Sequence, residues 1–533
     1  MTAMAGRCPD EVPGREIEPR LSLYTGTVTP LFSLPQTHLH PSLPSILRDS
    51  PQTARQARVA VLQRAAPRIC ATSSFPDLSS LPILSSRFPL PLPPFTLPAR
   101  PHPSPARASV GIDVAVVERA PGLGQSGTAL SLWGNAWRAL DALGVAALLR
   151  TDYVRLEGID IAAADGTALR SFDFADCNVG PDHEVRGVTR AHLLSCMASQ
   201  LPPGTIRFAT TITHMPEPTT TTTASAVTVT LSNGATIEAK ALIGCDGNAS
   251  GVASWLGLPP TNYAGYRAAR GVAELDPAES ADFAVAAGGG GDAEGGDVGG
   301  SVEGRGRVGM AILPLIPPSP PSASPSPHPI RASPFALPPP GSAAAKEEAL
   351  SYVQGWQGGI ERLIHATPAT SIVVGTITDR WTMPPPLGTW GRGAVTLAGD
   401  AAHPMTPNLG QGACTALEDA VILARCLWEA SVPDGEDRKG SGGVEGGEEG
   451  ASVRRRVESE KVCGALREYE RLRGRRVAQL TVRSFGIGWL LQLPQEVVCF
   501  ARDKVVLPHL FSPSHFLDHA LFDCGKLPDS DAS

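Results

Sequence analysis

Apolar spacing changes from a strand period to a helix period on either side of residues 399–412. Before this stretch, residues 393–398 (Gly-Ala-Val-Thr-Leu-Ala) alternate and branch as a buried strand does. After it, apolar residues recur at helical spacing, at Ala413, Leu417, Val421 and Ala424. The pattern therefore predicts a strand, a loop and a helix. Gly410 and Gly412 lack side chains where the helix begins, so main-chain N–H groups and the positive end of the helix dipole can meet an anionic or electron-rich ligand.

The same patterning predicts strands and helices over most of the chain after residue 111. Residues 112–117 form a β-branched run typical of a strand in a parallel sheet, and Glu118 follows it. Further strands are expected at 226–231, 235–239 and 241–244. Helical periodicity occurs at 135–150, 189–201, 343–365 and 462–481. The last helix is rich in arginine, which we interpret as a solvated face: Arg467, Arg471, Arg473, Arg475 and Arg476.

Composition limits how much of the 533-residue chain can pack into a core. Its 51 Pro and 55 Gly are concentrated in a few tracts, and three of them, 288–306, 317–340 and 434–450, are too polar or too rich in Pro and Gly to order themselves. The net charge of -7, with no basic stripe, gives no reason to expect nucleic-acid binding. The ten Cys show neither C-x-x-C nor metal-ligand spacing, so we expect reduced thiols and no metal site. No apolar run approaches the roughly 20 residues needed to span a bilayer, and no transmembrane segment is expected.

The first 110 residues differ in composition from the rest. They are rich in Pro, Ser, Leu and Arg, and between residues 21 and 112 the acids are Asp49 and Asp77. Such a leader resembles an organelle transit peptide, which favours a plastid or other organelle; the cytoplasm is the alternative. A disordered tail, or sequence foreign to the mature protein, remains an alternative reading of the same composition.

Glu118 is chemically suited to accept hydrogen bonds from ribose hydroxyls, as an acid at the end of the second strand of a dinucleotide-binding sheet does. A G-x-G-x-x-G fingerprint should then lie about 20 residues upstream, and none is present. The pattern occurs at Gly122–Gly127 and Gly304–Gly309, but neither match has the strand, turn and helix around it that a phosphate loop requires. We interpret both as accidental.

Two further acids follow strand-like runs, each beside glycine: Asp246 in Cys245-Asp-Gly247 and Asp400 in Gly399-Asp-Ala-Ala-His-Pro404. Either alone could be an ordinary turn. Together with Pro407-Asn-Leu-Gly-Gln-Gly412, they resemble the second and third flavin motifs of the class A FAD-dependent monooxygenases, the para-hydroxybenzoate hydroxylase and zeaxanthin epoxidase group. Three other segments are similar to that family in the same order: Val116–Pro121, the Arg-x-x-Leu helix beginning at Arg190, and Leu466–Arg471.

The resemblance implies an α/β fold with a Rossmann-like FAD-binding domain, an inserted β-sheet substrate domain and disordered low-complexity tracts. Glu118 would hold the adenosine ribose, and Arg190 would lie near the FAD pyrophosphate. Asp246 would serve both FAD and the reduced nicotinamide cofactor. Asp400 would contact the ribityl or phosphate side, and Pro404 would line the substrate pocket. The full set of implied cofactor-binding residues is Glu118, Arg119, Arg190, Asp246, Gly247, Gly399, Asp400, Pro407, Leu409, Gly410 and Gly412.

The implied activity is a monooxygenase that uses NAD(P)H and O₂ to hydroxylate or epoxidise a small aromatic or isoprenoid-like molecule. Because the cofactor carries the chemistry, we assign no side chain as catalytic, and His403 is interpreted as a packed or solvent-facing imidazole. The alternative is a catalytically silent relative with impaired FAD binding that binds a ligand or partner. A reductase or halogenase of the same fold is a related possibility, although the Trp-x-Trp-x-Ile halogenase motif is missing. The sequence does not define the oligomeric state.

The chain departs from the family where the first β-α unit should be. That unit is absent or replaced, so residues 112–117 are expected to lose a neighbouring strand and FAD a helix N-terminus for its pyrophosphate. We therefore hypothesise that parts of 1–110 and of the tracts are mis-translated or unspliced. The predicted domains are a leader (1–110), a first FAD-binding part (111–262), a substrate-domain remnant (263–370), a second FAD-binding part (371–430), an acidic linker (431–460) and a helical C-terminal region (461–533).

Overall fold

The computed structural model describes the chain in sixteen pieces. They are residues 20–25, 30–35, 58–63, 112–124, 129–153, 155–163, 166–177, 180, 183–216, 226–275, 307–315, 337–356, 359–381, 388–431, 448–492 and 496–528. The predicted tract at 288–306 and almost all of the one at 317–340 lie outside the described residues.

A parallel sheet of five strands carries the candidate site. Its order is β17-β13-β3-β4-β9, and every neighbouring pair is parallel. Neighbours in this sheet are far apart in sequence, as in a doubly wound α/β fold, and this confirms the predicted fold class. The strands are β3 (Arg58–Gln63), β4 (Asp113–Glu118), β9 (Ile206–Arg207), β13 (Ala241–Cys245) and β17 (Val395–Leu397).

The central strand β3 comes from the segment expected to be a leader. In the strand register, Gln63 of β3 pairs with Glu118 of β4 on one side and with Cys245 of β13 on the other. The expectation that β4 lacks this neighbour is therefore corrected, because a short alternating run is enough to form a central parallel strand even within a Pro- and Ser-rich context. After Gln63 the sequence contains no glycine before Gly111. Strand β3 therefore takes the place of the family's first strand, but no glycine fingerprint follows it.

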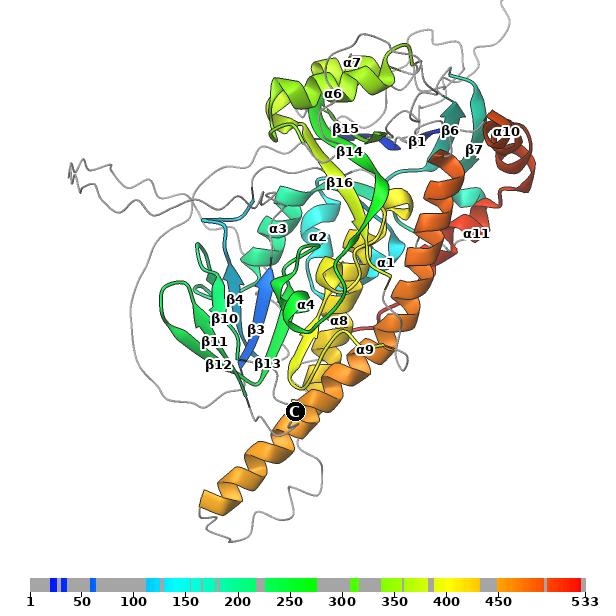
Figure 1. Ribbon diagram of the computed structural model, residues 1–533. Helices are drawn as coiled ribbons and strands as arrows, with labels where there is room; N and C mark the ends of the chain where they lie inside the picture. Colours follow the sequence, from blue (N-terminus) through cyan, green and yellow to red (C-terminus); the bar gives the residue numbers. More distant parts are fainter. Residues whose placement is uncertain are drawn as a thin grey trace, which may run out of the picture.

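A second sheet of seven strands lies beside the first, in the order β16-β14-β15-β2-β1-β6-β7. Two of its strands also come from the first 110 residues, which corrects the expectation of a structureless leader at those positions. Helices α6 and α7 cover the β14 end of this sheet (Figure 1). The elements are β1 (Arg20–Thr25), β2 (Pro30–Pro35), β6 (Gly158–Ala163), β7 (Ala168–Asp173), β14 (Asn262–Leu275), β15 (Arg307–Leu315), β16 (Val373–Asp379), α6 (Ala343–Val353) and α7 (Ile360–Ala366).

The other described strands form two small sheets, one of three strands and one of two. The predicted hairpin is confirmed: β11 (Val227–Leu231) pairs with β12 (Thr236–Ala239) around Gly234, whose positive φ of 81° glycine tolerates. Strand β10 (Ile212–His214) extends it. Strand β5 (Ala129–Leu132) pairs with β8 (Arg186–Thr189) and leads into the largest core.

Helices α8 and α9 run side by side against the parallel sheet (Figure 1). The predicted helix at 135–150 is divided at Gly144, and the one at 462–481 lies inside the much longer α9. No helix within the described ranges is long and apolar enough to cross a membrane. The α-helices are α1 (Gly134–Ala142), α2 (Ala146–Arg150), α3 (Arg190–Ser199), α4 (Gly251–Trp255), α8 (Gly412–Ser431), α9 (Glu448–Gln492), α10 (Glu496–Ala501) and α11 (Pro513–Leu517). Short 3₁₀ turns include η3 (Gly399–Ala401), η4 (Pro407–Leu409) and η6 (Asp518–Leu521).

Candidate functional site

The carboxyl ends of β4, β13 and β17 bring the three predicted acids to one edge of the parallel sheet. Glu118 is the last residue of β4, Asp246 follows β13, and Asp400 lies three residues beyond the end of β17. Ligands of doubly wound folds bind at this edge, where strand order reverses. The three acids therefore line one candidate site although 282 positions separate the first from the last (400 − 118).

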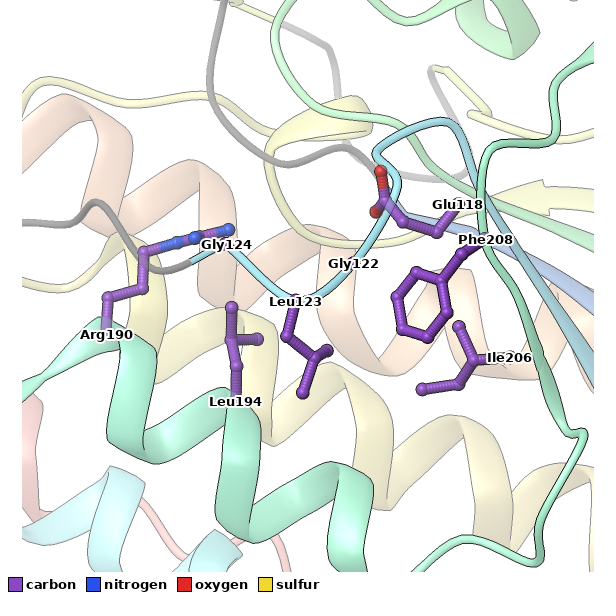
Figure 2. Close-up of a pocket in the computed structure, with 8 residues that line it drawn as sticks. All are labelled: Glu118, Gly122, Leu123, Gly124, Arg190, Leu194, Ile206 and Phe208. Carbon is purple, nitrogen blue, oxygen red and sulfur yellow. The ribbon is translucent and has the colours of Figure 1, made fainter. Parts of the chain in front are cut away.

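A pocket lies at the β4 end of this edge (Figure 2). Glu118 and Arg190 both line it, and the side chain of Arg190 extends toward Gly124. The Glu118 carboxylate is buried and its Oε1 accepts the Ala120 main-chain N–H at 2.8 Å. A Cβ added at Gly122 would meet no heavy atom within 4 Å, so this loop leaves room for a ligand. The other lining residues are Leu123, Leu194, Ile206 and Phe208.

The pocket combines a carboxylate, a cation and an apolar wall. Desolvation lowers the pKa of Arg190, while the charges of Glu118 and Asp400 act in the opposite direction; guanidinium nevertheless stays protonated. This chemistry suits a nucleoside whose hydroxyls meet Glu118 and whose phosphate meets Arg190. Arg119, which was predicted to join this group, is exposed and does not line the pocket.

Asp246 acts as a helix cap in the structure. Its Oδ1 accepts the Ser250 hydroxyl at 2.5 Å, and its Oδ2 accepts the Gly251 N–H at 2.6 Å at the start of α4. Gly247 follows with φ of 77°, a conformation that glycine tolerates and other residues rarely adopt. The Asp246-Gly247 pair thus has a local structural function in addition to the cofactor contacts predicted from the sequence.

The turn after β17 presents Asp400 to the site. Gly399 has φ of 58° and starts η3, while Asp400 is exposed and Pro404 is buried. Although the side chain of Asp400 reaches solvent, the surrounding chain desolvates it enough to raise its pKa, and the positive charges of Arg270 and Arg190 oppose this rise. Arg270, on strand β14 of the second sheet, was not predicted as a site residue. The sequence carries no sign that β14 approaches Asp400.

The loop before α8 carries donors that lack acceptors. Gly410 has φ of 61°, and a Cβ added there would lie 2.8 Å from Trp133 Nε1, so both conformation and space demand glycine. Trp133 Nε1 and Gln411 Nε2 are buried without a hydrogen-bond partner among the described residues. Buried donors of this kind normally have partners, so Trp133 Nε1 and Gln411 Nε2 are candidates to meet a polar ligand.

Arg473 and Arg476 correct the interpretation of α9 as having a solvated basic face. Arg473 is fully buried and paired with Glu418 and Asp419, whereas Arg471 is 63% exposed as predicted. His403, which was not assigned a role, is buried and forms a 2.6 Å contact with Asp419. The periodicity of α9 alone could not reveal this, because the partners lie on α8, at least 54 residues away.

Fold and site together define a flavin-dependent oxidoreductase, and comparison with known proteins supports this. The chain matches the model of the FAD binding domain over residues 108–275 and 380–438. It is 29% identical to Monooxygenase 2 of Arabidopsis thaliana, over 78% of this chain and 93% of that protein. It is 34% identical to the zeaxanthin epoxidase of Spinacia oleracea, over 39% of this chain and 28% of that one. The fold is similar to that of Klebsiella pneumoniae HpxO complexed with FAD and uric acid, with a TM-score of 0.56, 22% identity, and coverage of 78% of this chain and 91% of HpxO.

The chain contains an FAD binding domain and is similar to FAD-dependent monooxygenases, in agreement with the motifs in its sequence. The described residues fit FAD at two places. The Glu118 pocket offers an acid and an arginine for a nucleotide, and the loop before α8 offers unpartnered donors and a helix N-terminus for an electron-rich ring edge. The segment between β3 and β4, residues 64–111, lies outside the described residues.

Proposed function

We propose that the protein is a monooxygenase that uses NAD(P)H and O₂ to hydroxylate or epoxidise a small aromatic or isoprenoid-like molecule. One oxygen atom of O₂ enters the substrate, the other leaves as water, and NAD(P)H supplies the two electrons. The observation that carries this proposal is the loop at 407–412, where Gly410 is held at positive φ before α8. Gln411 Nε2 in this loop and Trp133 Nε1 beside Gly410 are buried without a hydrogen-bond partner among the described residues. Such a helix start stabilises negative charge that develops on a bound ring system.

When bound, FAD supplies electron transfer from NAD(P)H and the activation of O₂. The residues of this chain bind and orient. Glu118 would accept hydrogen bonds from ribose hydroxyls, Arg190 would neutralise the pyrophosphate, and Asp400 would meet the ribityl or phosphate side. The main-chain N–H groups of 409–412 would offer hydrogen bonds to the electron-rich edge of the flavin. Pro404, which is buried beside this loop, lines the substrate pocket and excludes water from it.

The substrate side of the site is formed by β14. Tyr266 on this strand approaches Asn408 of the loop, with 3.4 Å between its hydroxyl and Asn408 Oδ1, so the second sheet meets the loop directly. Relatives named for their reactions include an aurachin C monooxygenase/isomerase of Stigmatella aurantiaca and a 3-amino-4-hydroxybenzoate 2-monooxygenase of Streptomyces platensis. These names support an aromatic or isoprenoid-like substrate. The chloroplastic zeaxanthin epoxidases among the relatives support a plastid location.

The absorbance spectrum of the purified protein tests the proposal. A yellow protein with flavin bands that oxidises NAD(P)H and consumes O₂ when an aromatic or isoprenoid compound is added supports it. A colourless protein that FAD cannot reconstitute supports instead the silent relative that binds another ligand.

Two arginine variants locate the cofactor. Arg190→Gln is expected to weaken FAD binding roughly 10- to 100-fold, because a charge-assisted hydrogen bond is lost. Arg119→Gln removes the same charge from an exposed neighbour that does not line the pocket, and FAD affinity should stay within about twofold of the parent. Equal losses in both variants would show that the pocket in Figure 2 is not the nucleotide site.

A further inference from the structure

A buried carboxylate on α8 holds both ends of the turn that carries Asp400. Asp419 is fully buried, and its Oδ2 accepts the Gly399 N–H at 2.8 Å. The same oxygen lies 2.6 Å from His403 Nε2, which makes His403 the donor at the other end of the turn. One carboxylate oxygen therefore fixes the residue before Asp400 and the residue three positions after it.

The second oxygen of Asp419 is fixed from the other helix. Its Oδ1 accepts from Arg473 Nε at 2.6 Å, and Arg473 Nη2 lies 2.7 Å from Glu418 Oε2. Burial alone would raise the pKa of Asp419, but the electrostatic effects of His403 and Arg473 and the hydrogen bonds from His403 and the Gly399 N–H lower it well below its usual range. Asp419 is thus an ionised hub with both oxygens occupied, and it cannot rotate without breaking a charged contact.

A buried arginine holds the opposite side of the same turn. Arg380 directly follows β16, and its guanidinium donates to the Ala401 carbonyl. Its main-chain N–H donates to the Pro404 carbonyl at 3.0 Å. Asp419 therefore accepts hydrogen bonds from the N–H groups of the turn, and Arg380 donates hydrogen bonds to its carbonyl oxygens. Asp400 itself, between these attachments, is exposed.

We propose that Asp419 is a positioning residue for the cofactor site: through Gly399 and His403 it fixes the turn that orients Asp400 and Pro404. This inference rests on the proposed function, since Asp400 and Pro404 are the proposed FAD and substrate contacts. His403 acts here as a fixed donor, and it transfers no proton to substrate. Structural charge pairs elsewhere in the core should lack this influence on the cofactor.

The central variant is Asp419→Asn. The amide can keep an acceptor toward Arg473 only by turning its NH₂ group toward the Gly399 N–H, so one donor faces another. FAD affinity is expected to fall roughly tenfold or more. Glu470→Gln is the matched control, because Glu470 is an equally buried acid on α9 that pairs with Arg467 and does not touch the turn. It should lower the melting temperature and leave FAD affinity within about twofold.

His403 offers a rescue experiment. In His403→Gln the side-chain amide can still donate to Asp419 Oδ2, whereas His403→Met fills similar volume without a donor. We expect the parent flavin spectrum and FAD affinity in the first variant and a loss of roughly tenfold in the second. If the glutamine variant loses as much as the methionine variant, His403 acts through its charge or its proton, and the inference is overturned.

Two readouts separate positioning from simple destabilisation. Hydrogen exchange of the ligand-free protein should accelerate in Asp419→Asn over the turn at 399–404, with strands β11 and β12 unchanged. The FAD-binding losses of Asp419→Asn and Asp400→Asn should be non-additive in the double variant, because one acts through the other. Additive losses, or a turn that exchanges as in the parent, overturn the inference. A parent protein that binds no FAD overturns the proposed function and this inference with it, and that result is distinct because it precedes any variant.

Discussion

The two ends of the candidate cofactor site are held in different ways. At the β17 end, the turn at 399–404 is fixed by a buried acid and a buried base, and Gly410 is packed against Trp133. At the β4 end, the Glu118 loop is held by main-chain hydrogen bonds, such as Thr210 N–H to the Glu118 carbonyl, and Gly122 has open space around it. The first end is preorganised before any ligand binds. At the second end, the Glu118 loop keeps conformational freedom that it would lose when a ligand binds. Substitutions there should therefore affect ligand binding more than the stability of the fold.

Strand β3 joins these two ends, since it pairs with β13 on one side and β4 on the other. Val61→Pro removes a main-chain donor in the middle of this central strand, and proline is tolerated in sheets essentially only at edges or strand starts. We expect no soluble folded protein, measured by circular dichroism and size-exclusion chromatography.

Asp113→Pro is the control for this variant, because Asp113 is the first residue of β4, a position where proline is accepted. A folded Val61→Pro protein would show that β3 does not bridge the two halves. It would also favour the hypothesis that the first 110 residues are partly mis-translated or unspliced, which recovery of tryptic peptides across residues 79–119 of the native protein would contradict.

The buried charges of the first end predict a large loss of stability when one is removed. Arg473→Leu leaves Glu418 and Asp419 without their shared partner in the core, and this should cost about 3–5 kcal/mol of unfolding free energy. Arg471→Leu, two residues earlier on the exposed face of α9, should leave the denaturation midpoint unchanged. Urea melts of both variants measure this difference, and equal midpoints would contradict a buried role for Arg473.

Acid should destabilise the first end through two buried histidines. Burial lowers the pKa values of His183 and His519 to about 4, and His519 packs against Trp133 with ring centroids 5.4 Å apart. Above about pH 6.5 neither the folded nor the unfolded chain protonates them, and stability is complete. Between pH 6.5 and 4 only the unfolded chain gains these protons, so unfolding free energy falls, by at most about 3 kcal/mol for each histidine.

Thermal melts at pH 7.5 and 5 measure this loss. His183→Phe removes one of the titrating groups while keeping a ring against Phe174, whose centroid lies 5.0 Å away. Its melting temperature should fall less between the two pH values than that of the parent. An identical fall in both proteins would mean that His183 is protonated in the folded state.

A pair of glycine variants compares the two ends directly. Gly410→Ala imposes a side chain at φ of 61° and places its Cβ against Trp133, which should cost about 1–3 kcal/mol. Gly122→Ala meets no atom within 4 Å, so the free energy of unfolding should change by less than about 0.5 kcal/mol. Equal losses in chemical denaturation would remove the distinction between a preorganised and an open end.

The local spacing of apolar residues and glycines was sufficient to predict the secondary structure at the β17 end of the site. The β-branched run before Gly399 and the helical spacing after Gly412 fixed β17 and α8, and glycine at positive φ explains why Gly399 and Gly410 stand out in the sequence. Asp246 shows a limit of such patterns. Its motif was visible, but its use as the cap of α4 depends on how the chain turns back through Ser250.

Contacts between distant segments could not be read from the sequence. A fully charged residue such as Arg473 favours solvent unless acids are buried with it, and its acids lie on another helix. Strand β3 was missed for a different reason: its six residues carry a strand-like alternation, but Pro- and Ser-rich sequence surrounds them and no glycine fingerprint follows. Arg270 approaches Asp400 only because two sheets meet, and no local spacing reports that.

The smallest expected effect on stability, with a clear effect on binding, belongs to Glu118→Gln. The amide oxygen can still accept the Ala120 N–H, so unfolding free energy should change by less than about 0.5 kcal/mol. The lost charge weakens hydrogen bonds from ribose hydroxyls, and FAD affinity should fall roughly tenfold. Fluorescence titration with FAD and with FMN separates these effects, because FMN lacks the adenosine ribose and should bind parent and variant equally. A variant that loses affinity for both flavins would show that Glu118 maintains the shape of the site and does not contact the ribose. The β4 end would then be as preorganised as the turn after β17.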